Sequence, residues 1–320
     1  MTHLTDRATR DSASPGAWSS GRRGGPEHRK ESRVALVTCD LFPDLYADDV
    51  LLQRALQERG ARADAVRWDD PAADWAAYDL VVIRETWDYP PRRDEFVAWA
   101  HRVPRLANPA DVVEWNTDKR YLADLAAAGL PVTPTRYVAP GEAWIAPRAG
   151  EWVVKPTVSA ASQDTGRYAL PGQAGLAARH VARLHAAGRT AMVQPYLAAV
   201  DTAGETSVLC TPDRTGELTF SHGIRKGPLL TGPDLGDKPG EYDEEIAPRV
   251  PSPAELALAA QALAAVPGGP ERLLYARVDL FPGPDGAPVL AELELTEPSL
   301  FFGCAAGSAD RLAEAILRRL

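Results

Sequence analysis

Residues 275–281 read YARVDLF, residues 282–286 read PGPDG, and residues 289–297 read VLAELELTE. Polar and apolar residues alternate in the first and last of these segments, and this is the period of a β-strand. The Pro- and Gly-rich segment between them is typical of a turn. We therefore predict a β-hairpin near the end of the chain, with its charged residues gathered on one face.

Four charged residues decide what this hairpin can do. Pairing of the two arms places Asp279 near Glu292 and Glu294, with Arg277 beside them. Three carboxylates on one face repel one another unless a cation binds there, and hard divalent ions such as Mg²⁺ take oxygen ligands. We expect that neutral substitutions at these positions stabilise the protein when no cation is bound. The alternative is a solvated outer face of an amphipathic hairpin.

Composition limits the class of protein. The chain has 320 residues, 45% of them hydrophobic and 25% charged, as in a globular protein of two or three lobes. A formal net charge of −9 and the lack of a basic stripe argue against a nucleic-acid partner. No apolar run is long enough for a membrane span, and three separated cysteines predict a reducing, cytoplasmic compartment. Residues 1–32 contain few apolar residues and are expected to form a disordered tail.

The region after this tail has the pattern of a parallel α/β unit. Predicted strands at 34–38 and 78–83 alternate with helices at 49–60 and 94–102. Ligands bind at the carboxyl ends of such strands, where a polar and aromatic cluster follows the second strand. The candidate substrate contacts are Arg84, Thr86, Trp87, Asp88 and Tyr89. We predict that Arg84 pairs with a substrate carboxylate and that Trp87 walls the pocket; the alternative is that Arg84 pairs with a neighbouring acid.

Two lysines stand where a side chain can reach a phosphate. Lys155 ends an apolar strand, and the small hydroxylated loop at 157–162 follows it. Backbone amides of such a loop can surround phosphate oxygens. Lys119 follows a helix-start sequence, Asn-Thr-Asp. The alternatives are an exposed lysine at a strand end and an ordinary capped surface helix.

Further candidate contacts follow the later strands. Residues 194–197 leave an apolar strand, and backbone groups freed there can read an adenine edge. Glu205 can accept hydrogen bonds from ribose hydroxyls. Arg225 and Lys226 follow a strand predicted to end at His222, and they can neutralise a transferring phosphate. The alternatives are a plain strand exit and an exposed Arg-Lys pair.

The order of these motifs resembles the ATP-grasp superfamily, in the branch of glutathione synthetases and D-alanine–D-alanine ligases. The resemblance implies an α/β (α+β) fold with an N-terminal parallel α/β substrate domain at 33–115. A small lobe at 116–193 and a C-terminal lobe with the magnesium site at 194–320 would clamp ATP between them. The implied ligands are therefore ATP and Mg²⁺.

The resemblance also implies residue roles. The implied nucleotide contacts are Lys119 and Lys155 on the phosphates, Ser159 and Ser162 in the loop that closes on them, Gln194, Tyr196 and Leu197 at the adenine, and Glu205 at the ribose. The implied Mg²⁺ ligands are Asp279, Glu292 and Glu294, and the implied catalytic cation is Arg277, supported by Arg225 and Lys226. The chain departs from the common pattern in having Gln194 for Glu, Glu294 for Asn, and no glycine in the phosphate loop.

Segments 34–39, 68–71, 84–89 and 221–226 resemble the O-ureido-serine cyclo-ligases of D-cycloserine biosynthesis. This implies a small amino-acid-like substrate.

We expect an ATP-dependent carboxylate–amine ligase of specialised metabolism, with an acyl-phosphate intermediate and, in one form, intramolecular ring closure. The loops at 157–166 and 227–241 are candidate lids that exclude water. The alternatives are a small-molecule kinase on the same fold and a nucleotide-binding protein without catalysis. A homodimer is one option for the oligomeric state.

Overall fold

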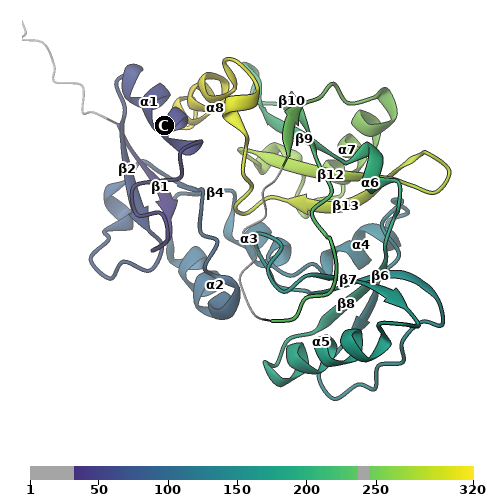
Figure 1. The fold of residues 1–320 in the computed structure, drawn as a ribbon. Helices are drawn as coiled ribbons and strands as arrows, with labels where there is room; N and C mark the ends of the chain where they lie inside the picture. The colour runs from purple at the N-terminus through teal and green to yellow at the C-terminus, as the bar shows by residue number, and fades with distance from the viewer. Residues whose placement is uncertain (1–31, 237–244) are drawn as a thin grey trace, which may run out of the picture. The chain divides into compact units, whose positions relative to one another are not determined.

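Three β-sheets organise the residues that the computed structural model describes, which are 32–236 and 245–320 (Figure 1). Residues 32–236 and 245–320 belong to one unit of the chain. The expected disordered tail at 1–32 lies outside the described residues except for its last position. The end of the expected lid at 227–241 also lies outside them. No helix of the described part is long and apolar enough to cross a membrane.

The first sheet is parallel and has the order β2-β1-β3-β4. Its strands are β1 (Arg33–Thr38), β2 (Arg62–Arg67), β3 (Leu80–Ile83) and β4 (Leu106–Ala107). The helices in this part of the chain are α1 (Asp49–Glu58), α2 (Arg93–Arg102) and α3 (Ala110–Asn116). The predicted parallel α/β unit is confirmed. Strand β2 went unpredicted because it carries three charged residues in six and contributes little to the core.

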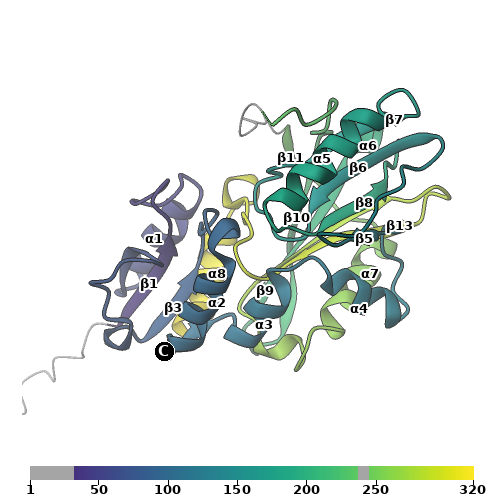
Figure 2. The ribbon, with the colours of Figure 1, turned by 90° about the horizontal axis from the view of Figure 1, so that it is seen from below.

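The second sheet is antiparallel and has the order β5-β8-β6-β7. Its strands are β5 (Arg136–Val138), β6 (Gly150–Pro156), β7 (Gly166–Leu170) and β8 (Ala191–Pro195). Helix α4 (Tyr121–Ala127) precedes the sheet, and α5 (Ala174–Ala186) packs on it (Figure 2). Apolar side chains of α5 and of the sheet form one buried cluster, so α5 holds these strands as a platform.

The third sheet has the order β11-β10-β9-β12-β13 and is antiparallel. Its strands are β9 (Glu205–Pro212), β10 (Leu218–Lys226), β11 (Ile246–Pro248), β12 (Ala276–Pro282) and β13 (Pro288–Glu294). The short helix α6 (Val200–Ala203) leads into it, and α7 (Pro253–Ala264) packs on β12 and β13. Arg277 lies opposite Glu294 and Asp279 opposite Glu292, so the predicted hairpin is confirmed, and the register shifts between Asp279 and Leu280.

Strand β10 runs beyond the predicted end at His222. An irregularity between Phe220 and His222 shifts its register, and the strand then continues to Lys226, opposite Glu205. Arg225 and Lys226 are consecutive residues of a strand and therefore point to opposite faces. This separation decides which of them can take part in a site.

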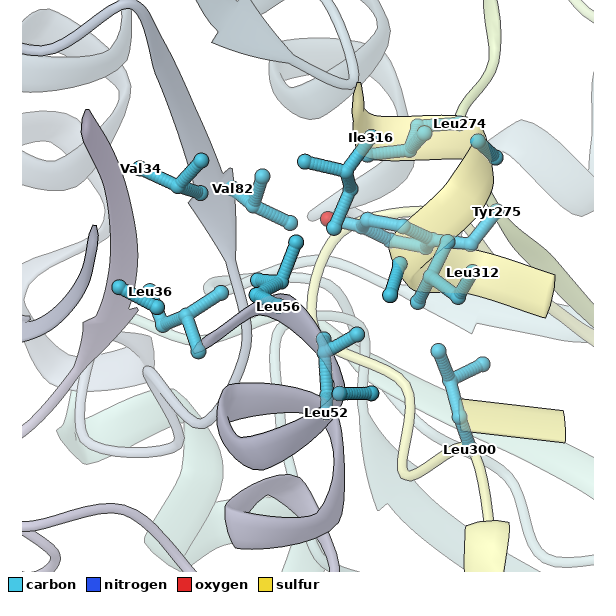
Figure 3. Packing of buried hydrophobic residues seen from close by; sticks show 14 of the residues in the cluster. Val34, Leu36, Leu52, Leu56, Val82, Leu274, Tyr275, Leu300, Leu312 and Ile316 are labelled. Atoms are coloured by element: carbon cyan, nitrogen blue, oxygen red, sulfur yellow. The ribbon is translucent and has the colours of Figure 1, made fainter. Parts of the chain in front are cut away.

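The last helix, α8 (Ser308–Leu317), returns to the first sheet. Figure 3 shows Leu312 and Ile316 of α8 against Leu52 and Leu56 of α1, in a buried cluster that also contains Tyr275. Helix α8 thus shares a buried core with the first sheet.

The N-terminus of α7 carries a complete capping box. The Ser252 side chain accepts from the Glu255 N–H at 3.3 Å, and the Glu255 side chain accepts from the Ser252 N–H at 2.6 Å. We expect Ser252→Ala to lower the free energy of unfolding by about 1 kcal/mol because one helix donor loses its acceptor. Urea unfolding measures this change, and an unaltered midpoint would show that the cap contributes nothing.

Candidate active site

A cavity of about 1070 Å³ is lined by residues of the second and third sheets and by residues that follow β1 and β3 of the first sheet. Most residues predicted from the sequence line it, namely Trp87, Tyr89, Lys119, Lys155, Ser159, Ser162, Gln194, Tyr196, Leu197, Glu205, Lys226, Arg277, Asp279, Glu292 and Glu294. Arg84, Thr86, Asp88 and Arg225 are not among its lining residues. The hairpin forms one wall, and the loop after β6 faces it.

Arg277 organises the carboxylates of the hairpin. Its Nη2 donates to Oδ2 of Asp279 at 2.9 Å, and its Nε donates to Oδ1 at 3.0 Å. Nη2 also donates to Glu294 across the strand pair. The carboxylates are therefore not left facing one another, because a guanidinium stands between them.

Three lysines complete this network. Nζ of Lys226 lies 2.6 Å from Oε1 of Glu205 and 3.3 Å from Oδ2 of Asp279. Nζ of Lys119 lies 2.8 Å from Oε1 of Glu292. Nζ of Lys155 lies 3.8 Å from Oε2 of the same carboxylate.

These pairs overturn one expectation. Neutral substitutions in the hairpin were expected to relieve repulsion, yet Asp279, Glu292 and Glu294 each have a cationic partner in the chain itself. A neutral substitution would leave a buried cation without its counter-charge, which costs stability.

The protonation of these groups follows from burial and from their partners. Burial opposes ionisation of Asp279, but the charges of Arg277 and Lys226 outweigh it and lower its pKa. Burial likewise opposes ionisation of Glu292, whose pKa is lowered by the charges of Lys119 and Lys155. Burial raises the pKa of Glu294 to about 7, against the pull of Arg277.

The donor chemistry of the hairpin fits Mg²⁺. Asp279, Glu292 and Glu294 offer only oxygen ligands, as this ion requires. Within the described ranges no group of three or more potential ligand residues is already arranged as a metal cluster. In the usual Mg²⁺ site, one or two carboxylates act together with substrate phosphates.

Lys119 reaches the hairpin because the junction of α3 and α4 is fixed to β13. Nδ2 of Asn116 donates to the Leu293 carbonyl at 2.7 Å, and Oδ1 of Asn116 accepts from the Leu295 N–H at 2.8 Å. The sequence Asn-Thr-Asp-Lys is therefore more than a helix cap. The side chain of Asn116 bonds to the backbone of β13 and the residue after it, as a neighbouring strand would. Lys119 then forms an ion pair with Glu292.

The loop after β6 has the irregular backbone of a ligand-binding loop. Ala161 and Ser162 have φ of 50° and 54°, in the left-handed region that non-glycine residues rarely adopt. Nη2 of Arg189 donates to the Val158 carbonyl at 3.0 Å, and Nζ of Lys119 donates to the Ser159 carbonyl at 2.8 Å. The loop thus adopts left-handed turns without the usual glycine.

Residues 194–197 line the cavity where β8 ends. Nε2 of Gln194 donates to Oγ1 of Thr135 at 2.8 Å. The guanidinium of Arg167 lies 3.6 Å from the ring centroid of Tyr196. Both side chains are engaged by protein, which leaves mainly the backbone of this segment to read a ligand.

Two residues have roles other than those predicted. Arg84 is fully buried, and its Nε donates to Oδ1 of Asp49 at 2.6 Å. This geometry gives Arg84 a structural role in place of the predicted substrate contact, which corresponds to the alternative of pairing with a neighbouring acid. Nε of Arg225 donates to the Ala203 carbonyl at 2.9 Å, on the face of β10 opposite Lys226. It does not reach the hairpin, so its predicted catalytic role is not supported.

Thr86 and Asp88 also stay out of the cavity lining. Thr86 is fully buried, and Oδ1 of Asp88 accepts from Nε1 of Trp68 at 2.8 Å. The cluster at 84–89 therefore divides by side chain. Trp87 and Tyr89 line the cavity, whereas the side chains of Arg84 and Asp88 bond to other parts of the protein.

The segment after β13 is irregular, and side chains hold each of its carbonyls. The bonds run from Tyr275 Oη to Thr296 (3.0 Å), from Trp87 Nε1 to Glu297 (3.1 Å), from Arg84 Nη2 to Pro298 (2.9 Å), from Arg277 Nη1 to Ser299 (3.1 Å) and from His222 Nε2 to Leu300 (2.9 Å). We call residues 296–300 the carbonyl-bound segment. Its path is set by side chains from three separate stretches of the chain.

Sequence reasoning missed several residues of the cavity. Phe42, Tyr46 and Trp87 contact one another edge to face, with ring centroids 5.3–5.6 Å apart, and all three line the cavity. Glu297 lines it as well. Phe42 belongs to segment 39–43, which the sequence pattern places at a ligand-binding position because it follows the carboxyl end of β1. Glu297 falls outside the alternation of Glu292 and Glu294, so the strand pattern gave no signal for it.

Burial and the charge of Glu294 raise the pKa of Glu297 to about 8. Burial together with the charge of Glu297 raises the pKa of Tyr89, which lines the same cavity.

Comparison with known proteins identifies the family of this chain. A family model described as the N-terminal domain of D-cycloserine synthetase DcsG matches residues 34–108. The cycloserine biosynthesis protein DcsG of Streptomyces lavendulae is 39% identical over 302 residues, which cover 90% of this chain and 98% of that protein. The chain belongs to the D-cycloserine synthetase family.

Solved structures agree with this assignment. The crystal structure of D-cycloserine synthetase DcsG has a TM-score of 0.77 and 37% identity, covering 90% of this chain and 99% of that one. A D-alanine–D-alanine ligase from Bacillus anthracis, at 12% identity and a TM-score of 0.59, covers 90% and 97% and shares the fold. The predicted ATP-grasp resemblance is confirmed, and the chain is an ATP-dependent ligase that forms carbon–nitrogen bonds.

Proposed function

We propose that this ligase activates the carboxylate of a small amino acid with ATP and closes a ring with a nitrogen of the same molecule. The observation that carries the proposal is a single cavity whose one wall holds the lysine–carboxylate network and whose other end is aromatic. Phosphoryl transfer requires the first feature, and a small organic substrate fits the second. The name and the identity of the relative DcsG support a ring-closing reaction.

In the proposed first step, a carboxylate oxygen of the substrate attacks the γ-phosphorus of ATP, and the bond to the leaving ADP oxygen breaks. The substrate nitrogen then attacks the acyl carbon and loses a proton, and the carbon–oxygen bond to phosphate breaks. Lys119 and Lys155 would hold the phosphates, and Arg277 with Lys226 would neutralise the charge that develops on them. Asp279, Glu292 and Glu294 would hold Mg²⁺, which neutralises phosphate charge when bound.

The test uses serine derivatives that carry an amino or ureido group on the side-chain oxygen, with ATP and Mg²⁺. We expect equal amounts of ADP and phosphate, a cyclic amide detected by mass, and a hydroxamate when hydroxylamine is added to trap the acyl phosphate. ADP without free phosphate, together with a stable phosphorylated product, would show a kinase instead.

Nucleotide binding should depend on Lys155. Burial lowers its pKa, and the charge of Glu292 opposes that change; its Nζ lines the cavity 3.8 Å from Oε2 of Glu292. We expect Lys155→Ala to weaken ATP binding by about 1.5–3 kcal/mol through loss of a charge-assisted contact. Calorimetry measures this, with Arg148→Ala on an exposed loop as the charge-matched control. Equal ATP affinity in both variants would remove Lys155 from the phosphate site.

A further inference from the structure

The carboxylates that line the cavity are not equivalent. Glu205, Asp279, Glu292 and Glu294 each form an ion pair with a lysine or arginine of the chain. Glu297 lines the same cavity, and within residues 32–236 and 245–320 it has no cationic partner closer than 4 Å. A partly buried carboxylate without a counter-ion is costly, and a ligand cation can remove that cost.

The backbone that carries Glu297 is fixed before any ligand arrives. Nε1 of Trp87 donates to the Glu297 carbonyl at 3.1 Å, and Nη2 of Arg84 donates to the next carbonyl, that of Pro298, at 2.9 Å. Tyr89 lines the cavity together with Glu297. Such preorganisation is what a specific polar contact requires, because little ordering is left to occur on binding.

The surroundings of Glu297 suit a cationic amino group. Trp87 lies beside it and contacts Phe42 and Tyr46, so the end of the cavity combines one unpaired carboxylate with aromatic faces. Aromatic faces attract cations, and a carboxylate fixes their direction. The carboxylates Asp279, Glu292 and Glu294 of the lysine–carboxylate network lie on β12 and β13, and Glu297 comes three residues after the end of β13.

We propose that Glu297, with Tyr89, binds the α-ammonium group of the substrate and thereby selects amino acids over carboxylic acids that lack this group. The inference rests on the proposed function, since it assigns one substrate group to one residue of that site. Glu297 lies three residues after Glu294 in the sequence. A substrate whose α-ammonium group binds to Glu297 would therefore direct its own carboxylate toward the transferring phosphate.

The experiment compares two substrates in two proteins. In the wild-type protein, kcat/KM for the amino-acid substrate should exceed that for its analogue with hydrogen in place of the α-amino group by about 10- to 100-fold. Glu297→Gln keeps the size of the side chain but removes the charge. It should lower this preference at least tenfold, mainly through KM, and leave ATP affinity and the Mg²⁺ requirement unchanged.

Two further variants separate binding from folding. Glu297→Asp keeps the charge and should retain a preference for the amino substrate at a lower rate. Glu217→Gln, on the exposed turn between β9 and β10, removes the same charge outside the cavity and should leave the preference as in the wild type. A preference unchanged in Glu297→Gln, or a raised Mg²⁺ requirement in that variant, would overturn the assignment while wild-type turnover still upheld the proposed function. A wild-type protein that forms no amide from any amino acid would overturn both.

Discussion

Glu292→Gln is expected to lower turnover by about 10²- to 10³-fold, the usual loss when one preorganised charge is removed from an active site. Glu292 is the shared partner of Lys119 and Lys155, which come from different parts of the chain. Without its charge, two ammonium groups face each other across the place where the phosphates would lie. The substitution therefore disturbs both lysines as well as the proposed Mg²⁺ site.

The same variant also distinguishes two views of the hairpin. If the carboxylates mainly repelled each other, Glu292→Gln would raise the melting temperature. Because Glu292 is paired in the structure, we expect a lower melting temperature together with the lost turnover. Glu217→Gln, on the exposed turn between β9 and β10, is the matched control and should change neither quantity. Near-normal Mg²⁺-dependent turnover in Glu292→Gln would show that the hairpin face is only a surface.

Arg84→Ala is expected to lower the free energy of unfolding by about 3–5 kcal/mol, as when one partner of a buried ion pair is removed. The Asp49 carboxylate would stay buried without its guanidinium, and the Pro298 carbonyl would lose its donor. Urea unfolding measures the change. Arg102→Ala, at the exposed end of α2, removes the same charge and should change the stability by less than about 0.5 kcal/mol.

A contrary outcome for Arg84 is easy to recognise. Full stability of Arg84→Ala combined with a higher KM for the amino acid would restore the direct substrate contact that the sequence suggested. The two roles affect different quantities. Loss of a buried ion pair lowers the free energy of unfolding, whereas loss of a ligand contact raises KM alone.

Local patterns predicted the parts of the fold that depend on local chemistry. Alternation and turn residues were enough to predict the hairpin, in which Asp279 lies opposite Glu292. Apolar strands separated by helices were enough for the parallel first sheet. Each of these features is determined within a few tens of residues, so the pattern contains the necessary information.

Features that depend on distant partners could not be predicted. Strand β10 has a register shift in its pairing with β9. Lys226 lines the cavity, whereas Arg225 lies on the opposite face of the strand. Arg84 was predicted to contact a ligand because it follows β3. Its partner is instead Asp49 on helix α1, which lies 35 residues earlier in the sequence. The role of Glu297 depends on which carboxylates already have cations, and only the assembled cavity shows that.

The carbonyl-bound segment has a consequence for how this family can change its substrates. Its backbone path is specified by donors outside the segment, among them Trp87, Tyr275 and His222. The side chains at 297 and 299 are therefore free to vary without moving the main chain that displays them. Substrate range and structural integrity are encoded at different positions, so new specificities can be selected at these two sites while the rest of the scaffold is inherited unchanged.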